Sequence, residues 1–394
     1  VKCFKWLFKE GNLKFIDARS DHEYKYPSQQ EFEWKKTTRE QHHHGKHPHI
    51  SLDDVVYVET VGGDLTVKIE DNTKTGQGIY AEPVDQLDQT LDDAEVLYAN
   101  LGNLIIFKIK PYQEKSFRYF VFNVKVQEVR RIDAIENSCV LLPEDQGIIF
   151  SNGYYLQSGE YKLFDNEYQN MSFVSKKPSS NGEDFLYTFY DKATGSYLLV
   201  IYNIIEQEIQ TPIFCHGYAS FDNGSLFLFK GDEEAKKHHA FQIWNTPFIS
   251  EDIQHQHSQT STSLLAKIGN KEVVRAMAET KEIISLSDKE DSYEGLYVDI
   301  YTKCNDVLDT YHWLSNDESE GLYSLLEAVR DVSKSAIDEF EKIVRQKKSA
   351  HEAIVFQANN IEQVQKEFSR ASSKTLQTYI STLSKVRALK GGLI

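Results

Sequence analysis

The sequence predicts a mainly β body followed by an α-helical, coiled-coil C-terminal region. Between about residues 92 and 248 it consists of short apolar runs of strand length, separated by turns rich in Gly, Asn and Asp. After residue 263 the apolar residues instead recur every three or four positions, as they do in amphipathic helices. Residues 251–263 are polar and of low complexity, which is typical of a linker between two such parts.

The body is predicted to be propeller-like. Gly102, Gly147, Gly195 and Gly224 are each followed by an apolar run, at intervals of 45, 48 and 29 residues. The first two intervals match one blade of a β-propeller, so we expect a stack of about four or five small sheets. A β-sandwich with long loops is the alternative. The predicted segments are residues 1–50 (a hairpin and a long loop), 51–250 (the β domain), 251–263 (the linker) and 264–394 (the helical region).

Two β-hairpins precede or open the body. Residues 2–8 and 13–18 flank a Glu-Gly-Asn turn, and residues 55–59 and 65–70 flank a turn at Gly62, Gly63 and Asp64. The glycines supply the positive φ angles that a tight reversal requires. Between the hairpins, residues 19–50 show no periodicity and are expected to form a long loop that braces the β body.

The C-terminal region is predicted to form helices at residues 264–285, 293–314 and 322–347. From residue 350 the apolar positions alternate in steps of four and three, which is coiled-coil spacing. Two arrangements agree with this spacing. One is a helical hairpin that packs on itself, and the other is a stalk for dimerisation, through about residues 350–390, or for docking a neighbouring domain.

Charge and composition limit the classes of partner that the chain can bind. The net charge is -16, but residues 323–394 hold 12 Lys/Arg against 8 Asp/Glu, so the first 322 residues are strongly acidic. An acidic surface repels nucleic acid, which leaves only the C-terminal arm as a DNA-binding candidate. No apolar run is long enough to span a membrane. The four cysteines are far apart and lack a CxxC pair, as expected for buried residues of a cytoplasmic protein. The first residue, Val1, suggests a piece of a longer polypeptide.

A dense group of histidines is the candidate metal site. It comprises His42, His43, His44, His47 and His49, and neutral imidazole is the commonest transition-metal ligand. His47 and His49, which flank Pro48, are the predicted ligands, together with nearby carboxylates. The alternative is a surface loop in which these rings pack against the second hairpin. No HExxH or Cys-His spacing accompanies the group.

Other chemistry is less well supported by the sequence. The acidic residues considered for acid–base catalysis share no recognisable spacing and are expected to be solvated: Glu59, Asp64, Glu70, Asp71, Glu82, Asp85, Asp92 and Asp93. There is no GxxxxGK[ST], GxSxG or kinase motif. We therefore predict no catalytic and no cofactor-binding residue in this chain. Basic residues on the predicted arm could contact phosphates, although interspersed acids favour an ordinary solvated face: Lys342, Arg345, Lys347, Lys348, Arg370, Lys374, Lys385, Arg387 and Lys390.

Several longer phrases resemble a known family. They include residues 45–51 (GKHPHIS), 56–66 (VYVETVGGDLT), 76–80 (GQGIY), 215–218 (CHGY) and 295–299 (GLYVD). Together they resemble the central region of large bacterial proteins described as DNA-repair ATPases, over about residues 35–315. In that family a MoxR-like AAA+ ATPase domain lies elsewhere in the chain, so the resemblance implies ATP and magnesium for that domain only.

The sequence and the resemblance together predict a non-catalytic interaction and regulatory region of a large cytoplasmic AAA+ ATPase. Its expected partners are other proteins or sibling domains of the same chain, with possible self-association through residues 350–390 and no membrane. One alternative is a metal-dependent hydrolase that uses His47 and His49. The second alternative is a C-terminal arm that binds nucleic acid.

Overall fold

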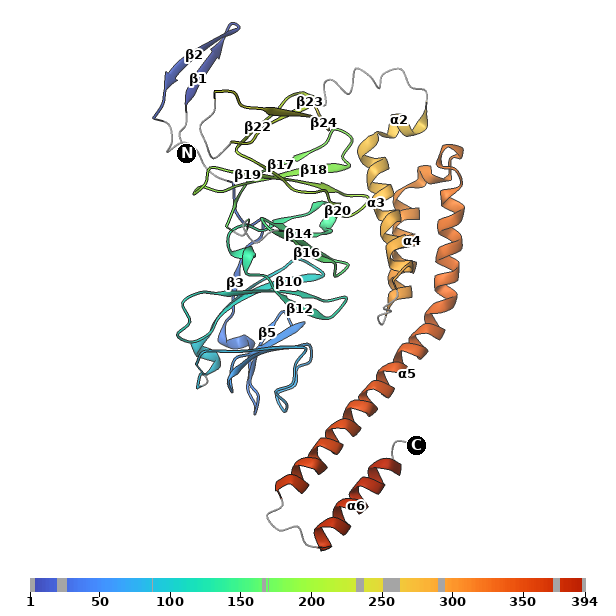
Figure 1. Ribbon diagram of the computed structural model, residues 1–394. Coiled ribbons are helices and arrows are strands. Elements are labelled where there is room, and N and C mark those ends of the chain that lie inside the picture. The colour runs from blue at the N-terminus through green and yellow to red at the C-terminus, as the bar shows by residue number, and fades with distance from the viewer. Residues whose placement is uncertain are drawn as a thin grey trace. The chain divides into compact units, whose positions relative to one another are not determined.

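The computed structural model describes residues 4–19, 27–86, 88–164, 168, 170–231, 237–250, 263–289, 295–370 and 376–391. It divides into two compact units, Val1–Ala278 and Glu279–Ile394 (Figure 1). The first unit is mainly β and the second is helical. All but one residue of the predicted linker 251–263 lie outside the described residues; the exception is Ser263, which caps the helix that follows.

The β unit consists of five antiparallel sheets after an N-terminal hairpin, numbered here along the chain. The first sheet contains β4 (His42–His43), β5 (His49–Leu52), β6 (Val56–Glu59), β7 (Asp64–Lys68) and β8 (Tyr80–Pro83). The second contains β3 (Lys35–Lys36), β9 (Glu95–Asn100), β10 (Leu104–Lys110), β11 (Arg118–Asn123) and β12 (Glu128–Arg131).

The remaining three sheets follow in chain order. The third contains β13 (Val140–Leu141), β14 (Gly147–Phe150), β15 (Gly153–Leu156) and β16 (Tyr161–Leu163). The fourth contains β17 (Ser172–Pro178), β18 (Asp184–Tyr190), β19 (Tyr197–Asn203), β20 (Glu208–Ile209) and β21 (Ile213–Cys215). The fifth contains β22 (Gly217–Ser220), β23 (Asn223–Phe229) and β24 (Phe241–Ile249).

The sheets pack face to face in an open series. Each neighbouring pair encloses one apolar cluster, represented by Val58 and Phe107, by Ile106 and Phe150, by Ile149 and Tyr187, and by Leu199 and Leu226. Among the described residues no sheet closes on itself, and the first and fifth sheets share no apolar cluster. The prediction of a mainly β body with several small sheets is therefore confirmed. The described sheets form an open stack and not the closed ring of a propeller.

The turn glycines explain the irregular spacing in the sequence. Gly147 and Gly224 lie where the second strand of a sheet begins, and Gly102 lies before β10, the second strand of the consecutive β9–β12 meander, to which β3 is added at the edge. Gly195 instead precedes β19, the third strand of the fourth sheet. The corresponding glycine before β18 is Gly182, which has a φ of +79°. With Gly182 in place of Gly195 the intervals become 45, 35 and 42 residues. The short interval of 29 therefore reflects a change of position within a sheet.

The segment before the first sheet braces the stack, as predicted. The side-chain amide of Gln29 exchanges two hydrogen bonds with the main chain of Phe173 in β17. Glu31 accepts a hydrogen bond from the main-chain N–H of Leu141 in β13. The segment then adds β3 to the second sheet and β4 to the first. The segment thus contacts four of the five sheets, two through its side chains and two through its backbone, which is why a region without periodicity is well packed.

The N-terminal hairpin has the predicted turn. It is formed by β1 (Lys5–Lys9) and β2 (Asn12–Asp17), with Glu10 and Gly11 at positive φ. Its large apolar side chains are exposed on both faces. Residues 1–3 lie outside the described part of the chain.

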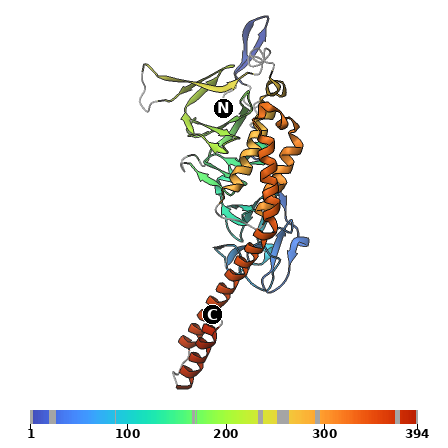
Figure 2. The same ribbon diagram turned by 90° about the vertical axis from the view of Figure 1, so that its right-hand side faces the viewer.

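The helices correct the sequence prediction at two positions. The predicted helix 264–285 is divided into α2 (Leu264–Ile268) and α3 (Asn270–Ser287), because Gly269 adopts a φ of +98°. The predicted helix 322–347 does not end there. It continues as α5 (Leu322–Arg370), a single helix of 49 residues, because no Gly or Pro interrupts it (Figure 2).

The other helices agree more closely with the prediction. The second predicted helix is α4 (Leu296–Thr310), followed by a 3-10 turn at His312–Ser315. After α5 the chain forms α6 (Leu376–Gly391), which packs against α5. In the described residues no helix is both long enough and apolar enough to cross a membrane.

Candidate metal centre

The first sheet has one apolar and one polar face, because side chains alternate along each strand. Ile50, Val58 and Val67 point into the apolar cluster shared with the second sheet. The opposite face carries polar side chains that are nevertheless buried: His49, Ser51, Tyr57, Glu59, Thr66 and Lys68. Burial of charged groups is costly unless each is paired, so this face requires a set of specific contacts.

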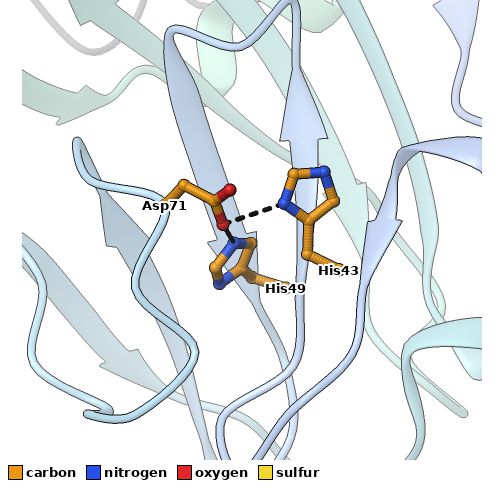
Figure 3. A group of neighbouring side chains, drawn as sticks. All are labelled: His43, His49 and Asp71. Atoms are coloured by element: carbon orange, nitrogen blue, oxygen red, sulfur yellow. Dashed lines mark hydrogen bonds and ion pairs between the residues drawn. The ribbon is translucent and has the colours of Figure 1, made fainter.

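Three side chains converge on this face, two from strands of the first sheet and one from the loop after β7 (Figure 3). His43 and His49 are directly opposite each other on β4 and β5, with ring centroids 5.4 Å apart. Nδ1 of His43 lies 2.8 Å from Oδ1 of Asp71, and Nε2 of His49 lies 2.9 Å from the same oxygen. Among the described residues these three side chains are a group whose nitrogen and oxygen atoms converge closely enough to hold one metal ion.

The electrostatics of the group suit a cation. Hydrogen bonds from His43 and His49 lower the pKa of Asp71, which therefore stays ionised at neutral pH. Burial lowers the pKa of His49, so its ring is neutral under the same conditions. Nδ1 of His49 is buried and has no hydrogen-bond partner among the described residues. Tyr57 covers the ring of His49 edge-on, at 4.9 Å between centroids.

A buried ion pair lies beside the group. Nζ of Lys68 is 2.5 Å from Oε2 of Glu59, and both side chains are only 3% exposed. Nδ1 of His47 lies 3.1 Å from the other carboxylate oxygen of Glu59. Lys68 also donates to the main-chain oxygens of Thr75 and Asn72, at 2.9 and 3.4 Å. The ammonium group thereby ties the loop that carries Asp71 to the sheet.

Three glycines allow this loop to approach so closely. A Cβ at Gly45 would overlap the side chain of Thr73, and one at Gly76 would lie 2.8 Å from Nδ1 of His47. A Cβ at Gly78 would collide with the main-chain oxygen of Val67. The glycines of the GKHPHIS and GQGIY phrases are therefore explained by close packing around the histidine loop.

The structure separates the two histidines that the sequence paired as metal ligands. His49 lies in the converging group, whereas His47 lies against Glu59. Of the remaining histidines, His43 joins the group, His42 lies 3.7 Å from Asp92, and His44 is exposed. The metal assignment itself stays a prediction. The contribution of His43 could have been found from the two-residue alternation of β4 and β5, but that of Asp71 has no local signal.

Two of the other acidic candidates, Glu82 and Asp93, have structural roles. Glu82 accepts hydrogen bonds from Arg118, Arg131 and Tyr80, and burial together with Glu82 raises the pKa of Tyr80 to about 12. Asp93 caps a short 3-10 turn by accepting from Thr90. These carboxylates are spread over several elements and do not converge on one reaction centre with Glu59.

The predicted turn residues lie between β6 and β7. Gly62 and Gly63 have φ angles of +94° and +101°, and Asp64 is the first residue of β7. On the arm, Lys342, Arg345, Lys347 and Lys348 lie on α5, and Lys385 and Arg387 lie on α6. Lys374 lies outside the described residues.

A family model described as "ATPase involved in DNA repair" matches residues 1–312. The chain belongs to this family. The match to the DNA-repair ATPase family includes all five sheets, the His43–His49–Asp71 group and α4, and it ends before α5.

Other comparisons add little to membership of the DNA-repair ATPase family. No curated protein matches the chain. Among solved structures, an oligogalacturonate lyase in complex with manganese is 12% identical, with 49% of this chain and 60% of that chain covered and a TM-score of 0.18. The chain thus spans less than two thirds of that structure, and we base no argument on a similarity at this level.

Proposed function

We propose that this member of the DNA-repair ATPase family is a non-catalytic interaction and regulatory region of a large cytoplasmic AAA+ ATPase of MoxR-like type. Its β body binds a protein partner or a sibling domain. Its helical arm either mediates self-association or transmits the effect of binding to the rest of the protein. The sequence supports the non-catalytic role, because it lacks the GxxxxGK[ST] loop that would hold ATP phosphates. ATP and magnesium belong, in this proposal, to a domain beyond these 394 residues.

Uncovered apolar side chains are the main support for an interaction role. In the N-terminal hairpin Trp6, Phe8 and Leu13 are 53%, 68% and 63% exposed. In the fifth sheet Phe241 and Ile243 are 62% and 60% exposed. Contiguous exposed apolar surface on a water-soluble domain is characteristic of sites that bind other proteins.

The arm shows the same feature. At 49 residues, α5 is about 73 Å long at 1.5 Å per residue. Ile354, Phe356 and Ile361 on its second half are exposed, as are Ile380 and Leu383 on α6. A helix that leaves such residues in water lacks the apolar neighbour that normally covers them. The packing of α6 against α5 supports the helical-hairpin arrangement, and the remaining exposed residues support self-association through residues 350–390.

Light scattering coupled to size-exclusion chromatography tests the arm. The 394-residue chain is expected to self-associate as its concentration rises, and the double variant Ile354→Glu, Ile361→Glu is expected to stay monomeric. Ile284→Glu, an equally exposed isoleucine on α3, is the matched control and should behave as the parent chain. A monomeric parent chain, or a double variant that still associates, would contradict assembly through the arm.

A second measurement tests the non-catalytic role. The purified chain is incubated with ATP and magnesium, and phosphate release is compared with that of a heat-denatured sample. We expect no difference between the two. Hydrolysis by the native chain alone would show that it contains a nucleotide site of its own.

A further inference from the structure

We propose that His43, His49 and Asp71 bind one divalent transition-metal ion, with zinc the closest match to the ligands. This inference is independent of the proposed interaction role. It shares His49 with the pair expected from the sequence, but it replaces His47 by a histidine on the neighbouring strand and adds a carboxylate from a loop 22 residues further along the chain.

The positions of the three side chains are close to those of a metal site. Zinc bonds to His nitrogen and carboxylate oxygen are about 2.0–2.1 Å long, so two ligand atoms at the tetrahedral angle lie about 3.3 Å apart. The two nitrogens are now 2.8 and 2.9 Å from Oδ1 of Asp71. An opening of about 0.5 Å at each contact would therefore admit the ion. Asp71 lies on a loop, so it can make this movement without disturbing a strand.

The ligand types select the metal. Two imidazoles and one carboxylate suit zinc and related first-row ions, whereas magnesium and calcium prefer oxygen ligands alone. His49 is fully buried, but His43 is 31% and Asp71 is 51% exposed. The fourth coordination position would thus face solvent and be filled by water. Three protein ligands and one open position are the arrangement of zinc sites that are not purely structural.

The surrounding structure holds the ligands in advance. His43 and His49 are cross-strand neighbours in a hydrogen-bonded sheet, so their separation is fixed by the register of β4 and β5. The loop that carries Asp71 is fastened by Lys68 and by the hydrogen bond from the main-chain N–H of His47 to the oxygen of Thr73, at 2.8 Å. The two histidines therefore lie on rigid elements and lose little entropy when the ion binds, while Asp71 needs only a small shift of its loop.

One feature limits the expected affinity. With a metal on Nε2, the proton of the His49 ring would occupy Nδ1, which is buried and has no partner among the described residues. Metal-ligating histidines normally donate that proton, and loss of this outer contact typically weakens binding by about 10–100-fold. We therefore expect weaker zinc binding than at sites with a complete outer shell.

Calorimetry and cobalt spectroscopy on the tag-free 394-residue chain test the proposal. We expect one equivalent of zinc to bind, and cobalt(II) to show the intense visible absorption of a site with fewer than six ligands. Asp71→Asn and His43→Ala should each weaken zinc binding at least 10-fold and abolish the cobalt band. His44→Ala, an exposed histidine next to the site, is the control and should bind zinc as the parent chain does.

The test uses variants of the two partly exposed ligands, His43 and Asp71, because removal of the buried His49 could prevent folding. Circular dichroism of Asp71→Asn and His43→Ala confirms that both variants are folded. The proposal is overturned if the parent chain binds no zinc, or if both variants bind it as tightly as the parent. Tighter binding of magnesium than of zinc would also overturn it, because that preference excludes a site built on imidazoles.

Discussion

Replacement of Lys68 by Met is the most direct test of how the polar face of the first sheet is stabilised. The ammonium group is enclosed by one carboxylate oxygen of Glu59 and two main-chain oxygens of the loop that follows β7. Methionine keeps the aliphatic length of the side chain but removes the charge, the ion pair with Glu59 and both hydrogen bonds to the main chain. The carboxylate of Glu59 is then left buried, and among the described residues His47 remains as its charge partner.

The magnitude follows from the burial of the pair. Removal of one partner from a buried ion pair costs about 3–5 kcal/mol, because an uncompensated charge remains. The contact between His47 and Glu59 survives, so we expect the lower half of this range, about 3–4 kcal/mol. For a domain of 150–250 residues each kcal/mol lowers Tm by about 2–4 °C, which gives a fall of about 6–16 °C.

Thermal and urea unfolding of the 394-residue chain measure the effect. Lys36→Met is the matched control, because the Nζ of Lys36 lies 2.9 Å from Glu95 although the two side chains are 67% and 43% exposed. An exposed pair of this kind contributes at most about 1 kcal/mol. Adding Glu59→Leu to Lys68→Met should recover part of the loss, since no charge is then left unpaired. Equal effects of Lys68→Met and Lys36→Met would refute the reasoning.

Three further predictions concern other parts of the β unit. Gly78→Ala should destabilise the chain more than Gly217→Ala in urea unfolding, because a Cβ at Gly78 would collide with a main-chain oxygen, whereas one at Gly217 would meet no atom closer than 4.0 Å; equal destabilisation by the two variants would argue against the observed packing. Cys139 is fully buried and burial raises its pKa, so a thiol reagent should label its peptide only at the rate of unfolding, as followed by mass spectrometry. Burial acts to raise the pKa of Asp53, but hydrogen bonds from a tyrosine and an asparagine of β9 outweigh it, and the pKa is lowered. This carboxylate therefore stabilises the chain above its ordinary pKa of about 3.9, and that contribution should disappear in acid titrations as the pH falls through the lower, folded value.

Some features of the protein follow from local sequence. The hairpin of β6 and β7 was predictable because Gly62 and Gly63 permit positive φ between two β-branched runs. The buried state of the described cysteines was expected from their spacing and is confirmed. The turn glycines indicated several small sheets, although Gly195 precedes the third strand of its sheet and so gives an irregular interval. The third helix was predicted to end at residue 347, but α5 continues to Arg370, because a polar stretch without Gly or Pro does not end a helix.

The candidate metal centre was only partly predictable. The sequence indicated a histidine loop and predicted His47 and His49, which flank Pro48, as ligands. The register of β4 and β5 decided instead that His43 faces His49, and the fold of a separate loop brought in Asp71. Likewise, nothing in the local sequence showed that Lys68 and Glu59 are buried together.

The sequence by itself thus determined the class of the protein: a mainly β body built of small sheets, a helical arm, an acidic charge balance and a set of family phrases. Only the tertiary structure decided that the series of sheets stays open and which polar side chains meet on the first sheet. The physical reason is that turns, caps and amphipathic periods depend on residues a few positions apart. Contacts across strands and between loops depend on register and burial, which are fixed only when the whole unit packs.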